Sequence, residues 1–333
     1  MSAADAAAAP FDASPLRRAA RWRWPEAVFW LLPVAAWFVF PDDLALLSQV
    51  AITALFALSL DLILGYAGIV SLGHAAFFGL GAYAAGLLAR AGHGDPLLGL
   101  AGAGAVAGAL GLVSSLLVLR GADLTRLMVT LGVALMLYEA ANKATAFTGG
   151  LDGLQGIEIA PLFGRFGFDL AGRTGYVYCV AVLFVLFVVA RRIVHSPFGL
   201  SLHGIRLNVA RMPALGTPVH ARLVAVYTLG AAYAGVAGAL LTQTTQFVSI
   251  DVLSFSRSAE LLLILVLGGT GSLYGAMLGA IVFMTVHHWL ADLNPQYWQF
   301  WLGLVLIVVV LFARDGLIGA LRSLARRLPG VAR

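Results

Sequence analysis

Charged residues are scarce in this chain, and their scarcity excludes an ordinary soluble globular protein. Of its 333 residues, 11% are charged and 61% are hydrophobic, whereas soluble domains carry roughly 25% charged residues. Several apolar runs approach or exceed the roughly 20 residues with which an α-helix crosses about 30 Å of hydrocarbon. The composition therefore predicts an all-α polytopic membrane protein.

Lysine and cysteine are nearly absent, which excludes several kinds of site. The only lysine, Lys143, is followed by Ala144, so the chain lacks the Lys-Ser/Thr pair with which a P-loop holds phosphates. The single cysteine, Cys179, can form no disulfide within the chain. His287 and His288 are adjacent and would point about 100° apart on a helix, which disfavours a shared metal site. We expect no ATPase activity, metal or cofactor in this chain.

Apolar segments predict about 8–10 transmembrane helices. They fall at 26–40, 43–64, 71–89, 97–119, 124–142, 175–194, 222–242, 258–289 and 297–313. As one helix, the run 258–289 would be about 48 Å long, and its glycines at 268–272 predict a break or re-entrant turn there. Because basic residues at both ends of the chain place both termini on the same side of the membrane, the number of crossings is expected to be even. It would be either eight full spans plus a broken pair or ten.

Arginine placement predicts the orientation, because loops on the cytoplasmic side carry an excess of positive charge. A basic tail, 1–25, precedes the membrane domain 26–313, and a second basic tail, 314–333, follows it. Both termini are therefore expected in the cytoplasm. The same rule places the loop 195–221 inside and the loop 143–174 outside.

A second break is predicted in the first third of the chain, near 65–71. Gly65 and Gly68 interrupt an apolar run there, and Ser71 is expected to cap the helix that follows. Asp61 and His74 are ionisable groups at membrane depth, where such groups usually face a bundle interior or water. These five residues are candidates for a translocation pathway. The alternatives are close helix packing for the glycines and structural hydrogen bonds for Asp61 and His74.

The two breaks resemble each other. Residues 62–82 and 265–280 share an apolar lead-in, G-x-x-G and then Ser-Leu before glycine-spaced apolar residues. Repeated broken segments in two halves of a chain are typical of transporters that bind substrate between the halves. An internal repeat and chance similarity between glycine-rich segments both remain open.

The inner loop contains a predicted amphipathic helix over 200–215. Leu202, Ile205, Val209 and Met212 recur at three- and four-residue steps, which places them on one helix face. Such a helix can lie in a groove of a partner protein or on the bilayer surface.

Five stretches, in order, carry a family resemblance. They are GYAGIVSLGHAAFFGLGAYAAGLL at 65–88, TGGLDGLQGI at 148–157, SPFGLSLHGIRLNVARMPALG at 196–216, AGVAGALL at 234–241 and SAELLLILVLGGTGSLYGAMLGA at 258–280. The chain resembles the permease subunit of ABC importers for branched-chain amino acids, the LivM-like branch. The resemblance runs from about residue 44 to 320 and leaves out the first 25 residues.

This resemblance implies a multi-pass protein of the bacterial inner membrane with several partners. The partners would be a second, LivH-like permease subunit, two ABC ATPase subunits that use ATP, and a periplasmic substrate-binding protein. The implied coupling residues are His203, Gly204, Ile205, Arg206, Asn208, Arg211, Ala214 and Gly216. The implied residues of the periplasmic loop are Thr148, Gly149, Gly150, Asp152 and Gly153.

One departure and three alternatives stand beside the resemblance. Relatives carry acidic residues in the docking segment where this chain has Leu207 and Val209, which puts the polar contacts to the ATPase in doubt. The alternatives are a stand-alone secondary transporter driven by protons through Asp61 or Glu139, a permease of the same family for urea or short amides, and an intramembrane hydrolase using Ser71 with His74.

Overall fold

Helices account for nearly all of the regular structure. The computed structural model describes residues 24–121, 123–169, 172–293, 295–297, 300–301, 303–304, 307 and 316–319. The elements are α2 (Trp24–Val39), α3 (Leu44–Leu60), the π-helix η1 (Asp61–Tyr66), α4 (Ala75–Arg90), α5 (Pro96–Val118), α6 (Asp123–Lys143), α7 (Thr145–Thr148), η2 (Gly150–Asp152), α8 (Arg173–Val194), α9 (Pro197–Leu207), η3 (Pro213–Leu215), α10 (Val219–Thr245), η4 (Ile250–Leu253), α11 (Phe255–Gly268) and α12 (Leu273–Leu293).

Six of these helices are long and apolar enough to cross a membrane, and two shorter apolar helices, α2 and α4, accompany them. The prediction of an all-α polytopic membrane protein is confirmed. The run 258–289 is divided as expected, because α11 ends at Gly268 and α12 begins at Leu273. The last predicted segment, 297–313, and both basic tails fall largely outside the described residues, so the number of crossings stays a prediction.

Several helices begin with a short polar cap that the sequence encodes locally. Asp95 accepts hydrogen bonds from the Leu97 and Leu98 amides ahead of α5, and Ser196 accepts from the Gly199 amide ahead of α9. A proline follows each of these caps, at a position where its missing N–H costs nothing. The start of these helices is therefore determined by neighbouring residues.

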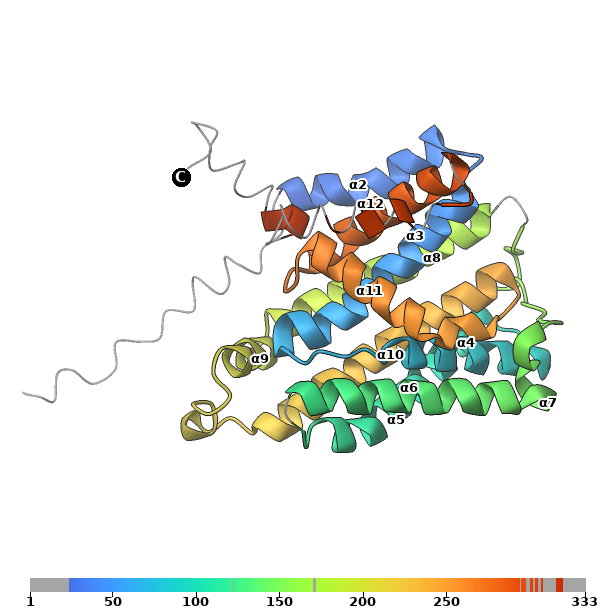
Figure 1. Ribbon diagram of the computed structural model, residues 1–333. Coiled ribbons are helices and arrows are strands. Elements are labelled where there is room, and N and C mark those ends of the chain that lie inside the picture. Colours follow the sequence, from blue (N-terminus) through green and yellow to red (C-terminus); the bar gives the residue numbers. More distant parts are fainter. Residues whose placement is uncertain are drawn as a thin grey trace, which may run out of the picture.

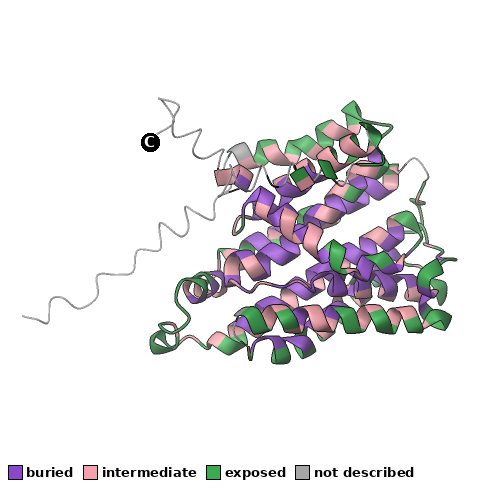
Figure 2. Ribbon diagram, viewed as in Figure 1, coloured by how far each residue is buried: buried purple, intermediate pink, exposed green. Residues whose placement is uncertain are grey.

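Two helix groups make up the bundle (Figure 1). One contains α4, α5, α6 and α10, and the other contains α2, α8, α11 and α12, with α3 contacting both groups. The helices α9 and α7 lie at opposite ends of the bundle. In α3 with η1, 72% of the spanning window is buried, against 11% in α6, so α3 forms the core and α6 lies at the surface (Figure 2).

Small residues bring α5 and α10 close together. A Cβ on Gly111 would lie 2.4 Å from the Ala231 Cβ, and one on Gly235 would lie 2.6 Å from the Ala103 carbonyl oxygen. Such contacts are how helices associate in lipid, where apolar burial alone provides no drive. The glycines of α5 thus act in helix packing.

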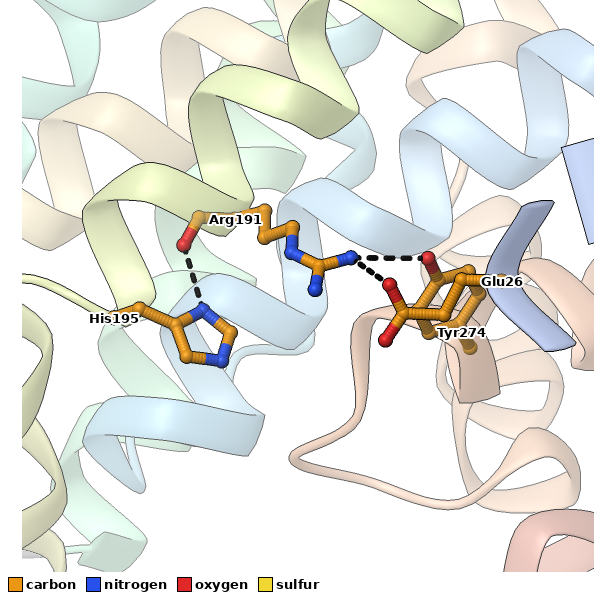
Figure 3. Close-up of polar contacts among 4 residues, drawn as sticks. All are labelled: Glu26, Arg191, His195 and Tyr274. Atoms are coloured by element: carbon orange, nitrogen blue, oxygen red, sulfur yellow. Dashed lines mark hydrogen bonds and ion pairs between the residues drawn. The ribbon is translucent and has the colours of Figure 1, made fainter. Parts of the chain in front are cut away.

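A buried ion pair that the sequence does not reveal ties α2 to α8 and α12. The Arg191 guanidinium donates hydrogen bonds to the Glu26 carboxylate and, at 3.3 Å, to the Tyr274 hydroxyl. The His195 ring lies next to the same arginine, with Nδ1 2.8 Å from its carbonyl oxygen (Figure 3). Because a charge within a bundle needs a partner, this pair fixes where α2 packs.

Candidate functional site

The two glycine breaks meet inside the molecule, although 210 residues separate them along the chain. The Asp61 carboxylate Oδ1 accepts a hydrogen bond of 2.7 Å from the Gly271 amide. A Cβ on Gly65 would lie 2.5 Å from the same Gly271 nitrogen. We call Asp61, Gly65 and Gly271 the break junction. Their contact requires both the carboxylate and the missing side chain at Gly65.

A change of helix type forms the first break. At Asp61 the α-helix widens into the π-helix η1, and residues 68–74 then run without helical structure back into the bundle to α4 (Figure 1). Gly68 has a φ of +73°, a conformation that glycine adopts without steric cost. Short π-helical turns are frequent at functional sites, and irregular backbone at membrane depth requires a protein or aqueous environment.

Arg206 reaches this junction from α9 at the end of the bundle. Its guanidinium donates a hydrogen bond to the Gly65 carbonyl oxygen, and its charge acts on Asp61. Its stem lies against Gly68, where an added Cβ would come 3.2 Å from Cγ of Arg206. One side chain of the inner loop therefore touches the first break and lies beside the second.

His74 has a different partner from those considered in the sequence analysis. Its Nε2 lies 2.8 Å from Ser59 Oγ, and the Ser59 hydroxyl donates its one hydrogen to the Phe56 carbonyl oxygen. That assignment leaves the proton of the imidazole on Nε2. The ring also stacks on Phe56, with 5.7 Å between centroids. The Ser71–His74 pairing of the hydrolase alternative is not among these contacts.

The prediction that Ser71 caps the helix after the break is wrong. The helix α4 begins at Ala75, four residues later. Its first amide donates to Ser258 Oγ on α11 at 3.0 Å, and the Leu72 amide donates to Thr130 Oγ1 on α6 at 3.3 Å. Hydroxyl groups from distant elements satisfy the backbone of this segment, so no local sequence pattern could have identified them.

The predicted helix at 200–215 is also wrong in its extent. The helix α9 begins at Pro197 and ends at Leu207, because Asn208 is extended and its side chain accepts a hydrogen bond of 3.1 Å from the Arg211 amide. Val209 is consequently exposed and not on the buried helix face. Leu202 and Ile205 are buried and pack α9 onto the bundle.

The predicted coupling residues divide into two groups. The exposed ones are His203, Arg206, Asn208, Arg211, Ala214 and Gly216. Ile205 is buried and Gly204 lies under Met212. Arg206, although exposed, also reaches the break junction through its guanidinium. The surface that α9 leaves open therefore also includes the exposed Leu207. The docking role of this segment stays a prediction.

The predicted periplasmic residues form a compact turn at the end opposite α9. Thr148 Oγ1 donates to the Ala141 carbonyl oxygen at 2.6 Å and accepts from the Gly150 amide at 3.2 Å. Gly149, Gly150 and Gly153 all have positive φ. Asp152 is exposed, and the turn leads into a bridge between Leu154 and Val248. Contact with a binding protein stays a prediction, as does the pathway role of Asp61, Gly65, Gly68, Ser71 and His74.

Comparison with known proteins identifies the class of the chain. The family model for the "Branched-chain amino acid transport system / permease component" matches residues 44–310. The chain belongs to this family. It is 30% identical over 315 residues to the high-affinity branched-chain amino acid transport system permease protein LivM of Escherichia coli K12, covering 87% of this chain and 73% of the relative. The LivM of Salmonella typhimurium LT2 is 30% identical over 319 residues, with the same coverage. No solved structure matches.

The family assignment agrees with the geometry of this permease. The matched residues begin at α3 and include α9, α11 and α12, so both breaks and the arginine between them lie inside the family region. The chain is a transport subunit and a multi-pass membrane protein, as expected from the sequence.

Proposed function

We propose that this permease is the membrane subunit of an ABC importer that translocates branched-chain amino acids or related small carboxylate solutes across the bacterial inner membrane. The names of both LivM relatives support the substrate class. A LivH-like permease, two ATPase subunits that hydrolyse ATP, and a periplasmic binding protein complete the assembly. The arginine clusters support cytoplasmic termini.

The observation that carries this proposal is the position of Arg206. Its backbone belongs to α9 at the end of the bundle and the residue is exposed, while its guanidinium donates a hydrogen bond to the Gly65 carbonyl oxygen at the break junction. Movement of α9 by an ATPase would shift this guanidinium and, with it, the Gly65 carbonyl and the Asp61 carboxylate. A movement at the surface would then reach the non-helical segment 68–74, which leads from the first break to α4.

The two apolar residues in the docking segment, Leu207 and Val209, also indicate what kind of partner surface they contact. Leu207 and Val209 are 74% and 54% exposed, and they stand where relatives carry acidic residues. Exposed apolar side chains beside Arg211 favour a partner surface with an apolar patch and one acidic group. We therefore expect the cognate ATPase to differ from that of relatives at this contact.

Uptake by the reconstituted complex tests the proposal. Proteoliposomes with both permeases, the ATPases and the binding protein should accumulate radiolabelled leucine only when ATP is supplied on the side of the membrane that carries the ATPase subunits. Urea and acetamide should not compete with leucine. Uptake by this chain alone under a proton gradient would contradict the proposal in favour of a secondary transporter, and competition by urea would favour the amide alternative.

Site-directed cross-linking tests the coupling surface. Leu207→Cys should form a cross-link to a co-purified ATPase subunit, because this side chain projects from α9. Met136→Cys on α6 is the matched control, since Met136 is also 74% exposed but lies in the middle of a membrane-spanning helix. An intact complex in which Met136→Cys cross-links and Leu207→Cys does not would move the coupling surface away from α9.

A further inference from the structure

A cavity of about 100 Å³ opens between α3, α4, α10, α11 and α12, apart from the break junction. Its polar side carries Gln49 and Thr53 from α3 with Arg257 and Glu260 from α11, and its apolar wall includes Phe56 and Ile264. It thus combines a cation, an anion and a hydrocarbon surface. A cavity of about 150 Å³ is known to hold a benzene molecule, so this smaller one has room for a group smaller than benzene, such as a branched aliphatic side chain.

The charges beside the cavity are only loosely paired. Arg257 Nη1 and Glu260 Oε2 are 3.4 Å apart, and their side chains are 50% and 37% exposed. Exposed pairs at this spacing contribute little to stability, in contrast to the buried Arg191–Glu26 pair. A ligand with its own carboxylate and ammonium can therefore separate the two side chains and bind both at little cost.

We propose that this cavity is a transient binding site for a zwitterionic aliphatic amino acid. The ligand carboxylate binds Arg257, its ammonium binds Glu260, and its side chain packs against Phe56 and Ile264. This inference rests on the proposed function and names where the substrate pauses within the permease. A neutral amide carries no charge and therefore cannot form an ion pair with Arg257 or Glu260, so the site selects against it.

The cavity is physically connected to the first break. Gln49, Thr53 and Phe56 recur at steps of four and three on α3, which places them on one helix face. Phe56 lies between the cavity and His74, on whose ring it stacks. Asp61 begins η1 five residues after Phe56, about 8 Å further along the helix. A ligand in the cavity would therefore contact the helix that leads into the break junction.

Protection of an introduced cysteine tests the site without any partner protein. The only native cysteine, Cys179, is buried, so Thr53→Cys provides one reactive thiol at the cavity. In the purified full-length chain, leucine should slow modification of Thr53→Cys by a small water-soluble methanethiosulfonate, and acetamide should not. Equal rates with and without leucine, up to its solubility limit, would overturn the proposal, as would equal protection by acetamide.

A charge variant with a matched control sharpens the test. Adding Arg257→Gln to Thr53→Cys should raise the half-protecting leucine concentration about tenfold or more, because a hydrogen bond to a charged group is lost. Arg257→Lys should recover part of the protection. Arg90→Gln, which removes an exposed arginine at the end of α4, should change nothing. Unaltered protection in Arg257→Gln would exclude the assigned carboxylate contact.

Uptake by the assembled transporter separates the failure of this site from the failure of the proposed function. If the unaltered complex accumulates leucine with ATP, Arg257→Gln and Glu260→Gln should each lower the uptake rate about tenfold, while Arg90→Gln should not. Normal uptake by both cavity variants would overturn the site and leave the proposed function intact. An unaltered complex that imports no amino acid would instead contradict the proposed function.

Discussion

The first break and the second break are built in different ways, despite their similar sequences. The first has a π-helix and seven non-helical residues, and its polar contacts come from α6, α9, α11 and the second break. The second is a turn of four residues, 269–272, in which Gly269 and Gly271 have positive φ. Side chains hold the first break in place, whereas close backbone packing holds the second.

This difference indicates separate roles. Contacts from four parts of the chain reach the first break, and under the proposed function a movement of α9 would reach it through Arg206. The second break keeps α11 and α12 together as a tight hairpin, since added Cβ atoms at Gly268 and Gly279 would lie 1.9 Å and 2.2 Å from backbone oxygens. The hairpin then presents Gly271 to Asp61 as a fixed donor.

The largest effect is expected from adding one methyl group to the hairpin. Gly268→Ala would place a Cβ against the Gly275 carbonyl oxygen, and backbone must move to accommodate it. We expect a loss of about 1–3 kcal/mol or more of stability, measured as a lower apparent Tm of the permease in detergent. Gly132→Ala on α6 is the control, because nothing lies within 4 Å of its Cβ and alanine favours a helix over glycine. An unchanged Tm for Gly268→Ala would contradict the tight hairpin.

The next effect concerns the carboxylate that joins the breaks. Asp61→Ala would leave the Gly271 amide without its acceptor, at a cost of about 1–3 kcal/mol. Asp61→Asn retains an acceptor oxygen of the same shape and should keep most of the stability and of the ATP-driven uptake. A proton-coupled carrier would instead lose uptake in Asp61→Asn as fully as in Asp61→Ala, because neither side chain titrates. Uptake and Tm of the two variants therefore decide between a structural acceptor and a proton carrier.

The sequence predicts where the helices break but not how the breaks are stabilised. Glycines mark both interruptions because local conformation and close approach require them, so Gly65, Gly68 and the run 268–272 can be recognised without a structure. Asp61 can be recognised as unusual at membrane depth. Its partner, the Gly271 amide, is 210 residues away and belongs to the backbone, where no residue type reveals it.

The same limit explains the two incorrect predictions. Ser71 has the residue type of a cap, yet Ser258 on α11 supplies the hydroxyl at the start of α4. The apolar periodicity continues to 215, but the helix ends at Leu207. There the Asn208 side chain accepts a hydrogen bond from the Arg211 amide and starts a turn. In both places a hydrogen bond decided by tertiary or turn geometry overrides a local pattern. The contact of Arg206 is hidden for the same reason, because its partner is a backbone carbonyl 141 residues away.

A smaller effect is expected where Arg206 crosses the first break. Gly68→Ala places alanine at a φ of +73°, which costs about 1–2 kcal/mol, and brings its Cβ within 3.2 Å of Arg206. Gly156→Ala is a matched control, with a φ of +71° and nothing within 4 Å. Both variants should lose similar stability, but only Gly68→Ala should lower leucine uptake per ATP hydrolysed. Equal coupling in the two would mean that Arg206 does not transmit movement of α9.

The smallest effect tests whether the first break depends on hydroxyl groups from other helices. Thr130→Val preserves the shape of the side chain and removes the acceptor of the Leu72 amide, a bond of 3.3 Å. Hydrogen bonds between membrane helices average about 0.6 kcal/mol, so the Tm of Thr130→Val should fall only slightly. Thr130→Ser keeps the hydroxyl and should keep the Tm of the unaltered permease. The informative readout is hydrogen exchange of the Leu72 amide, which should become faster in Thr130→Val and remain slow in Thr130→Ser. If exchange is equally slow in both, the irregular segment is held by its own backbone, and the first break would resemble the second more closely than its contacts indicate.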